Sequence, residues 1–388
     1  MEPIERSGDD YWFLYTGGTT GMPKGVMWRN HDLFSVLREA VYGILGEPIP
    51  ETYEEIGPAA QRIAEAGNAP IHLPASPLMH GTGVMSSMQT HYVGGTIVTL
   101  ERRHFEPDEL WETVQRHRVS QMAIVGDAFA KPMVRSLDDA RDAGRPYDLS
   151  TLLLVISSGV MWSAEVKRAL QGHHPVICYD SLGSSEGVGF ANDIATPGQE
   201  IETARFRIGK STSVFTEDGR AVEPGSGEIG MLAVGGHIPA GYYKDEEKSA
   251  RTFRVFDGKR YSVPGDFATV EADGTIALLG RGSVCINSGG EKVYPEEVEE
   301  AVKGAPGVQD CLVVGVPDDR FGEAVTAVVE AEQGATVDVD AIKNAADGSL
   351  ARFKRPRHVV VVDQILRGPN GKADYTWAKQ TAEKAVAG

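Results

Sequence analysis

Short apolar runs that alternate with helical patterns are the feature that most limits what this chain can fold into. Five runs in the first two-thirds have strand character: Trp12–Thr16, Gly95–Leu100, Gln121–Val125, Leu152–Ser157 and Val176–Tyr179. Helical spacing precedes the third run and follows the fourth. Strands and helices in alternation favour a largely parallel sheet that is covered by helices. We therefore predict an α/β fold.

The pattern changes between residues 205 and 279, where short strands are separated by Asp-Gly pairs typical of tight hairpin turns. These pairs are Asp218-Gly219, Asp257-Gly258 and Asp273-Gly274. They predict a small antiparallel, barrel-like subdomain that completes a large N-terminal domain, residues 1–281.

A new pattern starts after the Gly-rich segment 280–283. A helix is expected to open at Pro295, with Glu296 and Glu297 in its first turn, where acidic side chains favour the helix dipole. Strands are expected around this helix at Cys311–Val316, Val325–Glu330 and His358–Val362. Residues 282–388 are therefore predicted to form a small α+β C-terminal domain.

Composition excludes several classes of protein. The chain has 38 basic and 55 acidic residues, and the resulting net charge of −17 would repel a nucleic-acid backbone. Three cysteines without CxxC spacing build neither a disulfide framework nor a zinc ribbon. No apolar run approaches the ~20 residues of a membrane-spanning helix. We predict a cytoplasmic protein whose membrane contact, if any, is peripheral.

The segment TGGTTGMPKG, residues 16–25, follows the apolar run WFLY and is the most informative stretch for chemistry. Its glycines let the backbone amides point inward, its threonines add hydroxyl donors, and Lys24 adds a cation, all of which suit a polyphosphate. It differs from the Walker loop because the lysine follows Pro23. Taken alone, the segment is also compatible with a plain turn that closes a hairpin.

Seven motifs occur in an order that resembles the adenylate-forming superfamily of acyl-CoA synthetases, luciferases and peptide-synthetase adenylation domains. They are YTGGTTGMPKG at 15–25, SPLMHGTG at 76–83, LGSSEG at 182–187, GEIGMLAVGGHIPAGYY at 227–243, YSVPGD at 261–266, GRGSVCINSGGEKVYPEEVE at 280–299 and GPNGKADY at 368–375. The wording of the motifs looks most like actinobacterial synthetases that act on fatty acids and steroid side chains.

The resemblance implies ATP, Mg²⁺ and CoA as co-substrates and cofactors, and a small carboxylic acid as the substrate. It places Glu186 on magnesium, Lys24 and Thr16 beside the phosphates, and Lys372 at the reacting carboxylate. Nucleotide contacts are implied along both the phosphate loop and the later motifs: Thr16, Gly17, Gly18, Thr19, Thr20, Gly21, Lys24, Gly159, Asp180, Ser181, Gly183, Ser184, Ser185, Asp266, Arg281, Gly289, Gly290 and Lys372.

An acyl site is implied at His80, Gly83, Gly159 and Gly187. Nearby methionines adapt to irregular apolar shapes, which favours a bulky fatty or polycyclic acid over an amino acid. The resemblance also implies a mobile C-terminal domain that rotates so that Gly289 and Gly290 replace the lysine loop and line a pantetheine tunnel. Outside the family context, Asp266 and Lys372 would be interpreted as an ordinary turn residue and a solvated tail lysine.

Departures from the family pattern concern the hinge and the start of the chain. The hinge position, commonly Asp or Lys, is Ser283, and Pro264 precedes Gly265-Asp266. Family members carry a long segment before the phosphate loop, whereas here the loop starts after fifteen residues. We therefore expect a complementing N-terminal segment or self-association into a homo-oligomer.

Three functions are weighed from the sequence. The leading hypothesis is an ATP-dependent acid–CoA ligase that forms an acyl-AMP with release of pyrophosphate and then transfers the acyl group to CoA. A second is an adenylating enzyme that transfers the acyl group to a carrier protein. A third is a catalytically impaired fragment that binds nucleotide and needs an N-terminal partner segment.

Overall fold

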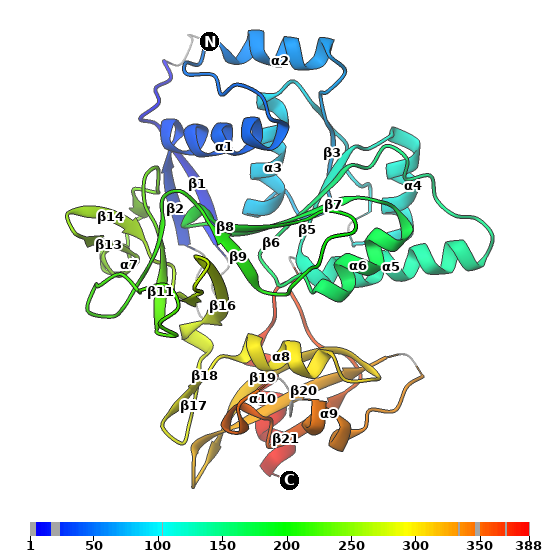
Figure 1. Cartoon of the computed structure of the whole chain (residues 1–388), viewed down its shortest axis with the longest axis vertical. Helices are drawn as coiled ribbons and strands as arrows, with labels where there is room; N and C mark the ends of the chain where they lie inside the picture. The colour runs from blue at the N-terminus through cyan, green and yellow to red at the C-terminus, as the bar shows by residue number, and fades with distance from the viewer. Residues whose placement is uncertain are drawn as a thin grey trace.

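A computed structural model describes residues 5–16, 24–102, 104–332, 334–345, 350–368 and 371–387. Figure 1 shows a larger N-terminal part above a smaller C-terminal part, with the helix α8 and a loop near the C-terminus between them. Among the described residues, none of the helices is both long and apolar enough to cross a membrane.

The parallel half of the main sheet contains five strands in the order β4-β3-β5-β6-β7. Their bounds are β3 (Ile71–Pro74), β4 (Thr96–Ile97), β5 (Gln121–Ile124), β6 (Leu154–Ser158) and β7 (Ile177–Ser184). The helices of this half are α3 (Gly81–Tyr92), α4 (Pro107–His117), α5 (Gly126–Asp142) and α6 (Ala164–His173). The predicted parallel, helix-covered sheet is confirmed.

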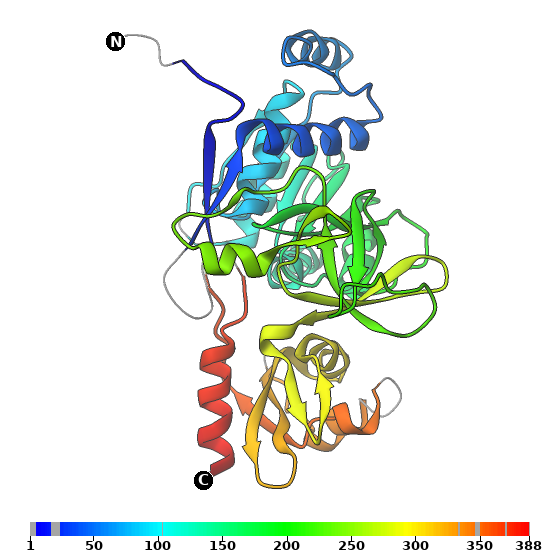
Figure 2. The same cartoon turned by 90° about the vertical axis from the view of Figure 1, so that its left-hand side faces the viewer.

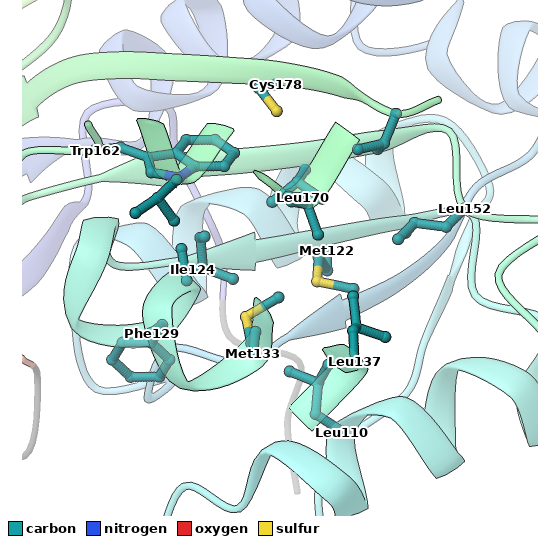
Figure 3. Close-up of a cluster of buried hydrophobic side chains, with 14 of the residues drawn as sticks. Leu110, Met122, Ile124, Phe129, Met133, Leu137, Leu152, Trp162, Leu170 and Cys178 are labelled. Atoms are coloured by element: carbon teal, nitrogen blue, oxygen red, sulfur yellow. The ribbon is translucent and has the colours of Figure 1, made fainter. Parts of the chain in front are cut away.

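Figure 3 shows the hydrophobic core between this sheet and its helices. Met122 and Ile124 point from β5 toward Phe129 and Met133 of α5, and all four are buried. Burial of apolar surface contributes about 25 cal/mol per Å², so this core holds the parallel strands in a fixed register. The ends of β6 and β7, which border the candidate site, are thereby fixed as well.

The antiparallel strands continue the same hydrogen-bonded sheet through the β7–β8 pair. They are β8 (Gly187–Ala195), β9 (Arg205–Ile208), β10 (Thr212–Phe215), β11 (Ile229–Val234), β13 (Phe253–Phe256), β14 (Lys259–Ser262), β15 (Asp266–Val270) and β16 (Thr275–Arg281). Asp257-Gly258 joins β13 to β14 and Asp273-Gly274 lies between β15 and β16, as the turn chemistry predicts. Both residues of the first turn have positive φ angles, 48° and 73°.

A separate three-stranded sheet carries the N-terminal hairpin in the order β1-β2-β12. Its strands are β1 (Tyr11–Thr16), β2 (Lys24–Arg29) and β12 (Gly241–Tyr242), and its neighbouring helices are α1 (Asn30–Leu45) and α7 (Glu246–Thr252). The helix α2 (Ile56–Glu65) packs against α3 instead. Strand β12 brings residues 241–242 beside β2, so two motifs that are more than 200 residues apart in the sequence meet here.

The C-terminal part has its own five-stranded sheet, in which β21 pairs with β20 in parallel. Its elements are η1 (Gly282–Val284), β17 (Ile286–Ser288), β18 (Glu291–Val293), α8 (Pro295–Lys303), β19 (Val308–Asp318), β20 (Gly322–Ala331), α9 (Val339–Ala345), η2 (Arg352–Lys354), β21 (His358–Val362) and α10 (Tyr375–Ala387). The helix opens at Pro295 as predicted. We retain 281/282 as our proposed domain boundary.

Candidate active site

The β1–β2 hairpin frames the segment that sequence analysis interprets as a phosphate cradle. Thr16 and Lys24 are paired across the last register position of the hairpin. The predicted contacts Gly17, Gly18, Thr19, Thr20 and Gly21 lie outside the described residues. The Lys24 ammonium donates to the carboxylate of Asp245, the residue that caps the N-terminus of α7. This pairing lowers the pKa of Asp245.

Glu186 lies in the short turn between β7 and β8, and its neighbourhood is fixed by two aromatic side chains from other elements. The Tyr242 hydroxyl donates to Glu186 Oε1 over 2.7 Å. The indole of Trp28, which is fully buried, donates to the Ser185 carbonyl over 3.0 Å. Because both partners belong to the three-stranded sheet, that sheet holds the Glu186 turn in place.

Three other predicted nucleotide contacts lie near this turn. Ser181, Gly183 and Ser184 belong to the last part of β7 and are partly exposed. The Ser184 hydroxyl accepts a hydrogen bond from the Glu186 amide over 3.2 Å. The end of β7 is therefore a polar, partly open segment suited to contacts with a small molecule.

Asp266 and Arg281 begin β15 and end β16, and they occupy directly opposite positions of this antiparallel pair. The Arg281 Nε atom lies 3.3 Å from Asp266 Oδ1. The charge of Asp266 is the largest cause that raises the pKa of Arg281. Asp266 offers two acceptor oxygens, as the two hydroxyls of a ribose require.

Lys372 comes to this site from the C-terminal part. Its Cε atom lies 4.0 Å from the point where a side chain at Gly159 would begin, just beyond the end of β6. His80 is the residue before α3. Burial lowers the pKa of His80, and the charge of Lys372 lowers it further, which indicates that the two side chains are neighbours. The segment that leads to and from Lys372 is visible in Figures 1 and 2 as the thin reddish loop that reaches from the smaller part toward the larger.

The charges of four residues converge at this point: Glu186, Asp266, Arg281 and Lys372. Burial lowers the pKa of the Lys372 ammonium, and the charge of Arg281 lowers it further. The carboxylates of Glu186 and Asp266 act in the opposite direction. Two cations held together here are suited to an anionic ligand, which would relieve their mutual repulsion.

Contacts with α5 seat the lysine loop against the larger part. A side chain at Gly371 would meet Ala128 at 3.1 Å and Phe129 at 3.3 Å, so the loop backbone packs directly on the start of this helix. Further along α5, Lys131 donates to the Gln309 carbonyl over 3.0 Å. The structure therefore has the lysine loop docked in the site.

Gly289 and Gly290 are placed elsewhere in this arrangement. They form the two-residue turn between β17 and β18, with φ angles of 64° and 88°. Both views show this hairpin directed away from the larger part. The structure does not bring them together with Lys372.

Three residues that the sequence predicts to contact a ligand, Asp180, Gly187 and Gly83, take part in the packing of the fold. The Asp180 carboxylate is buried and lies 3.0 Å from the Lys167 ammonium of α6, away from the half-exposed face of β7. A side chain at Gly187 would meet Val234 at 2.7 Å, and one at Gly83 would meet the Ser76 carbonyl at 2.6 Å. The Asp180 side chain therefore pairs within the core and the two glycines permit close packing, while the ligand contacts of these three residues stay predictions.

Sequence analysis missed the residues that support the site, namely Trp28, Tyr242, Asp245 and Glu296. Only Tyr242 and Glu296 fall within motifs, and neither is predicted from the sequence to contribute to the site. Their partners lie in distant parts of the chain, so no local pattern reveals them. The pairing of a buried indole or phenol with a turn is visible only in three dimensions.

Glu296, in the first turn of α8, packs its carboxyl against the backbone of Gly280 and Arg281. Its Oε2 atom would lie 2.1 Å from a Cβ at Gly280, and its Oε1 atom accepts from the Arg281 amide over 3.3 Å. Among the described residues, Oε2 is buried without a hydrogen-bond partner. Burial, and then the charge of Glu299, raises the pKa of Glu296 to about 8, with Asp266 adding to the effect.

We expect the variant Glu296→Gln to flatten the dependence of stability on pH. The folded chain keeps a proton on Glu296 that the unfolded chain, with the ordinary pKa of 4.5, releases. The free energy of unfolding of the parent should therefore fall as pH rises from about 5 to about 8. Denaturant unfolding at a series of pH values measures this slope, and equal slopes for parent and variant would contradict the prediction.

Two family models match the chain. The model of the AMP-binding enzyme matches residues 1–243, and the model of the AMP-binding enzyme C-terminal domain matches residues 297–372. The first match alone covers more than half of the chain. The chain belongs to the AMP-binding enzyme family.

Curated proteins with similar sequences are CoA ligases. A medium/long-chain-fatty-acid–CoA/3-oxocholest-4-en-26-oate–CoA ligase of Mycolicibacterium smegmatis is 46% identical over 385 residues, which are 98% of this chain and 68% of the relative. A 3-oxocholest-4-en-26-oate–CoA ligase of Rhodococcus rhodochrous is 46% identical over 381 residues, 97% of this chain and 67% of the relative.

Solved structures agree on the fold. An anthranilate CoA ligase, AuaEII, in complex with anthranoyl-AMP superposes with a TM-score of 0.81 at 21% identity, covering 100% of this chain and 70% of the other. ATP-bound MatB from Rhodopseudomonas palustris gives a TM-score of 0.75 at 24% identity, with 99% and 71% covered. At these identities the likeness concerns the fold alone, and the predicted fold class is confirmed.

Proposed function

We propose that this chain is an ATP-dependent acid–CoA ligase, which activates a carboxylate as acyl-AMP and then transfers the acyl group to CoA. The observation that carries the proposal is that Lys372 reaches the end of β6, that Arg281 pairs with Asp266 over 3.3 Å, and that the charges of Arg281, Glu186 and Asp266 all act on Lys372. Family membership supports the use of ATP and ligation to CoA.

Adenylation needs an electrostatic site because it brings two anions together. An oxygen of the substrate carboxylate attacks the α-phosphorus of ATP, the new O–P bond forms, and pyrophosphate leaves with the electrons of the bond that breaks. We assign Lys372 to the carboxylate and the α-phosphate, and Arg281 is a second cation whose charge acts on Lys372. Cations held in position before the reaction lower such a barrier.

We also propose that the enzyme uses Mg²⁺. Among the described residues there is no cluster of three His, Cys, Asp or Glu side chains that could hold a metal. A single carboxylate, Glu186, still fits Mg²⁺, which keeps several waters and is commonly held by one or two carboxylates together with substrate phosphates. The bound ion would supply positive charge against the phosphates, and Tyr242 orients the Glu186 carboxylate for it.

The remaining nucleotide contacts follow from position. We assign Asp266 to the ribose hydroxyls, Thr16 and Lys24 to the phosphates, and the end of β7 with Gly159 to the base and the α-phosphate. Lys24 has Asp245 as its partner in the structure, so phosphate would compete for this ammonium. The side chain of Asp180 is not included in this assignment.

The acid is proposed to be a medium- or long-chain fatty acid or a steroid side-chain acid. The names of the curated relatives support this class. His80 at the start of α3 borders the site, and the preceding residues Leu78 and Met79 are exposed by 48% and 73%. These exposed apolar side chains suit an apolar acid and a peripheral contact with a membrane. We propose that the protein acts in the cytoplasm.

Two alternatives to the ligase are an enzyme that transfers the acyl group to a carrier protein and a catalytically impaired fragment that needs a partner segment. Tyr11 and Tyr15 are exposed on the edge strand β1, and a complementing segment or a second copy could pack on them. The measurement that separates the hypotheses is pyrophosphate release from ATP with a panel of acids, followed by addition of CoA. Release followed by acyl-CoA supports the ligase, release without acyl-CoA supports carrier transfer, and no release with any acid contradicts both enzymes.

We expect the variant Tyr242→Phe to lower the rate of adenylation by about tenfold, because a hydrogen bond to a charged group contributes about 1.5–3 kcal/mol. Loss of the 2.7 Å hydrogen bond frees Glu186 to rotate, so half-maximal activity should require more Mg²⁺. A titration of pyrophosphate release against Mg²⁺ measures both effects. Tyr53→Phe, whose hydroxyl pairs with His31, is the control, and an unchanged Mg²⁺ requirement in Tyr242→Phe would contradict the role.

A further inference from the structure

The loop that carries Lys372 is a small hairpin closed by its own backbone. The Gly368 amide donates to the Lys372 carbonyl over 2.9 Å, and the Gly371 amide donates to the Gly368 carbonyl over 2.9 Å. Arg367 and Ala373 face each other in a β-bridge. The two arms of the hairpin therefore face each other at Arg367 and Ala373, and Lys372 lies directly before the second arm.

The Arg367 side chain joins this hairpin to the rest of the C-terminal part. Its Nη1 atom donates to the Gly371 carbonyl over 3.0 Å, in the peptide bond that leads directly into Lys372. Its Nε and Nη2 atoms donate to both carboxylate oxygens of Asp310 over 2.7 and 2.9 Å. One guanidinium thus fastens the loop to β19 with three hydrogen bonds.

Asp310 is itself well held. Burial opposes its ionisation, but the hydrogen bond and charge of Arg367 keep the pKa of Asp310 below its usual value. The Lys303 ammonium also lies 3.8 Å from Asp310 Oδ1. The preceding residue, Gln309, accepts from Lys131 and Arg135 of α5. The anchor of Arg367 is therefore continuous with the contact between the two parts of the protein.

A lysine needs such an anchor if it is to act at one point in space. Its four-carbon side chain is flexible, so the space that its ammonium can reach depends on the position of the backbone from which it starts. A planar guanidinium that binds a carboxylate in a fork sets that backbone with little freedom. We propose that Arg367 is a positioning residue that holds Lys372 in place for adenylation. The inference rests on the function proposed above.

The test compares Arg367→Gln with Lys354→Gln. Lys354 pairs with Glu297 over 2.7 Å, and its side chain is 21% exposed against 16% for Arg367, so the control removes a similar ion pair from the same part of the protein. Arg367→Gln should lower kcat for pyrophosphate release about 10–100 fold, because displacement by 1 Å can cost about 10² in rate. KM for ATP and acyl transfer from supplied acyl adenylate should stay near the parent values. A loss shared equally by both half-reactions would overturn the proposal.

Two further measurements separate positioning from a structural role. The double variant Arg367→Gln/Lys372→Ala should adenylate no more slowly than Lys372→Ala alone, since the two residues act as one unit, whereas multiplied losses would overturn the proposal. Arg367→Lys, which keeps the charge without the fork, should recover only part of the rate. Full recovery of the adenylation rate in Arg367→Lys would mean that charge alone is sufficient, and it would overturn the proposed role of the fork.

Hydrogen exchange tests the anchor without any activity. The amide of Gly368, which donates to the Lys372 carbonyl over 2.9 Å, should exchange at least several-fold faster in Arg367→Gln than in the parent or in Lys354→Gln. Equal protection in all three proteins would overturn the proposal even if the parent is active. Faster exchange in Arg367→Gln, together with a parent that releases no pyrophosphate, would support the anchor and contradict the proposed function, so the two failures are distinguishable.

Discussion

Replacement of Lys372 with Ala is expected to lower the rate of acyl-adenylate formation by about 10²–10³ fold, the loss typical of one electrostatic donor at a transition state. The structure places this ammonium beside Gly159 and in the field of Glu186 and Asp266. Transfer from supplied acyl adenylate to CoA should remain, because the lysine loop and the Gly289-Gly290 turn are not brought together. Pyrophosphate release and thioester formation are measured separately.

The matched control is Lys379→Ala. Lys379 lies on α10 of the same part of the protein, pairs with Glu323 over 3.4 Å, and is 45% exposed. It should retain both half-reactions. If Lys372→Ala slowed adenylation and transfer equally, the assignment of the lysine to a single step would be wrong.

The charged centre of the site could be predicted from the sequence, and its support could not. Motif order placed Glu186, Asp266, Arg281 and Lys372 in one family pattern, and these four now converge in space. The hydrogen bond from Tyr242 to Glu186 spans 56 residues of sequence. A contact of this kind depends on how β12 docks on β2, which no local spacing encodes.

Asp180 shows how a strand's alternation can mislead. The predicted strand ended at Tyr179, whereas β7 continues to Ser184. Because successive side chains point to opposite faces, Asp180 shares the buried face of Cys178 and meets Lys167. Motif proximity suggested a nucleotide contact, but the strand's phase turns this carboxylate into the core.

Most of the differences between the predicted and the observed strands concern short strands. Strands β2 and β3 were not predicted, because KGVMWR carries two cations and a glycine and IHLP ends in proline, so neither has an extended apolar run. The run predicted at Gly95–Leu100 forms only the two-residue strand β4. In contrast, the turns at Asp-Gly pairs and the helix at Pro295 were predicted correctly, because their signals are local.

The second large effect is expected at Gly290, since the structure places this residue at the tip of an exposed turn while the lysine loop occupies the site. A Cβ atom at this position would meet no atom within 4 Å, and the turn is exposed, so we expect bulk to be tolerated in this arrangement. We expect Gly290→Trp to spare pyrophosphate release and to lower CoA transfer at least about tenfold, because the indole would obstruct the proposed pantetheine path and displace the reacting thiol. Burst release of pyrophosphate and acyl-CoA formation measure the two steps.

Backbone strain must be separated from bulk in this experiment. Gly290 has a φ angle of 88°, which side-chain-bearing residues rarely adopt, so any substitution strains the turn. Gly290→Ala carries this strain without the indole and is the matched control. Transfer should be lowered far more by Trp than by Ala, with adenylation near the parent rate in both. An equal loss in the two variants would assign the effect to the turn, and a matching loss of adenylation in Gly290→Trp would contradict the alternation of the two loops in one site.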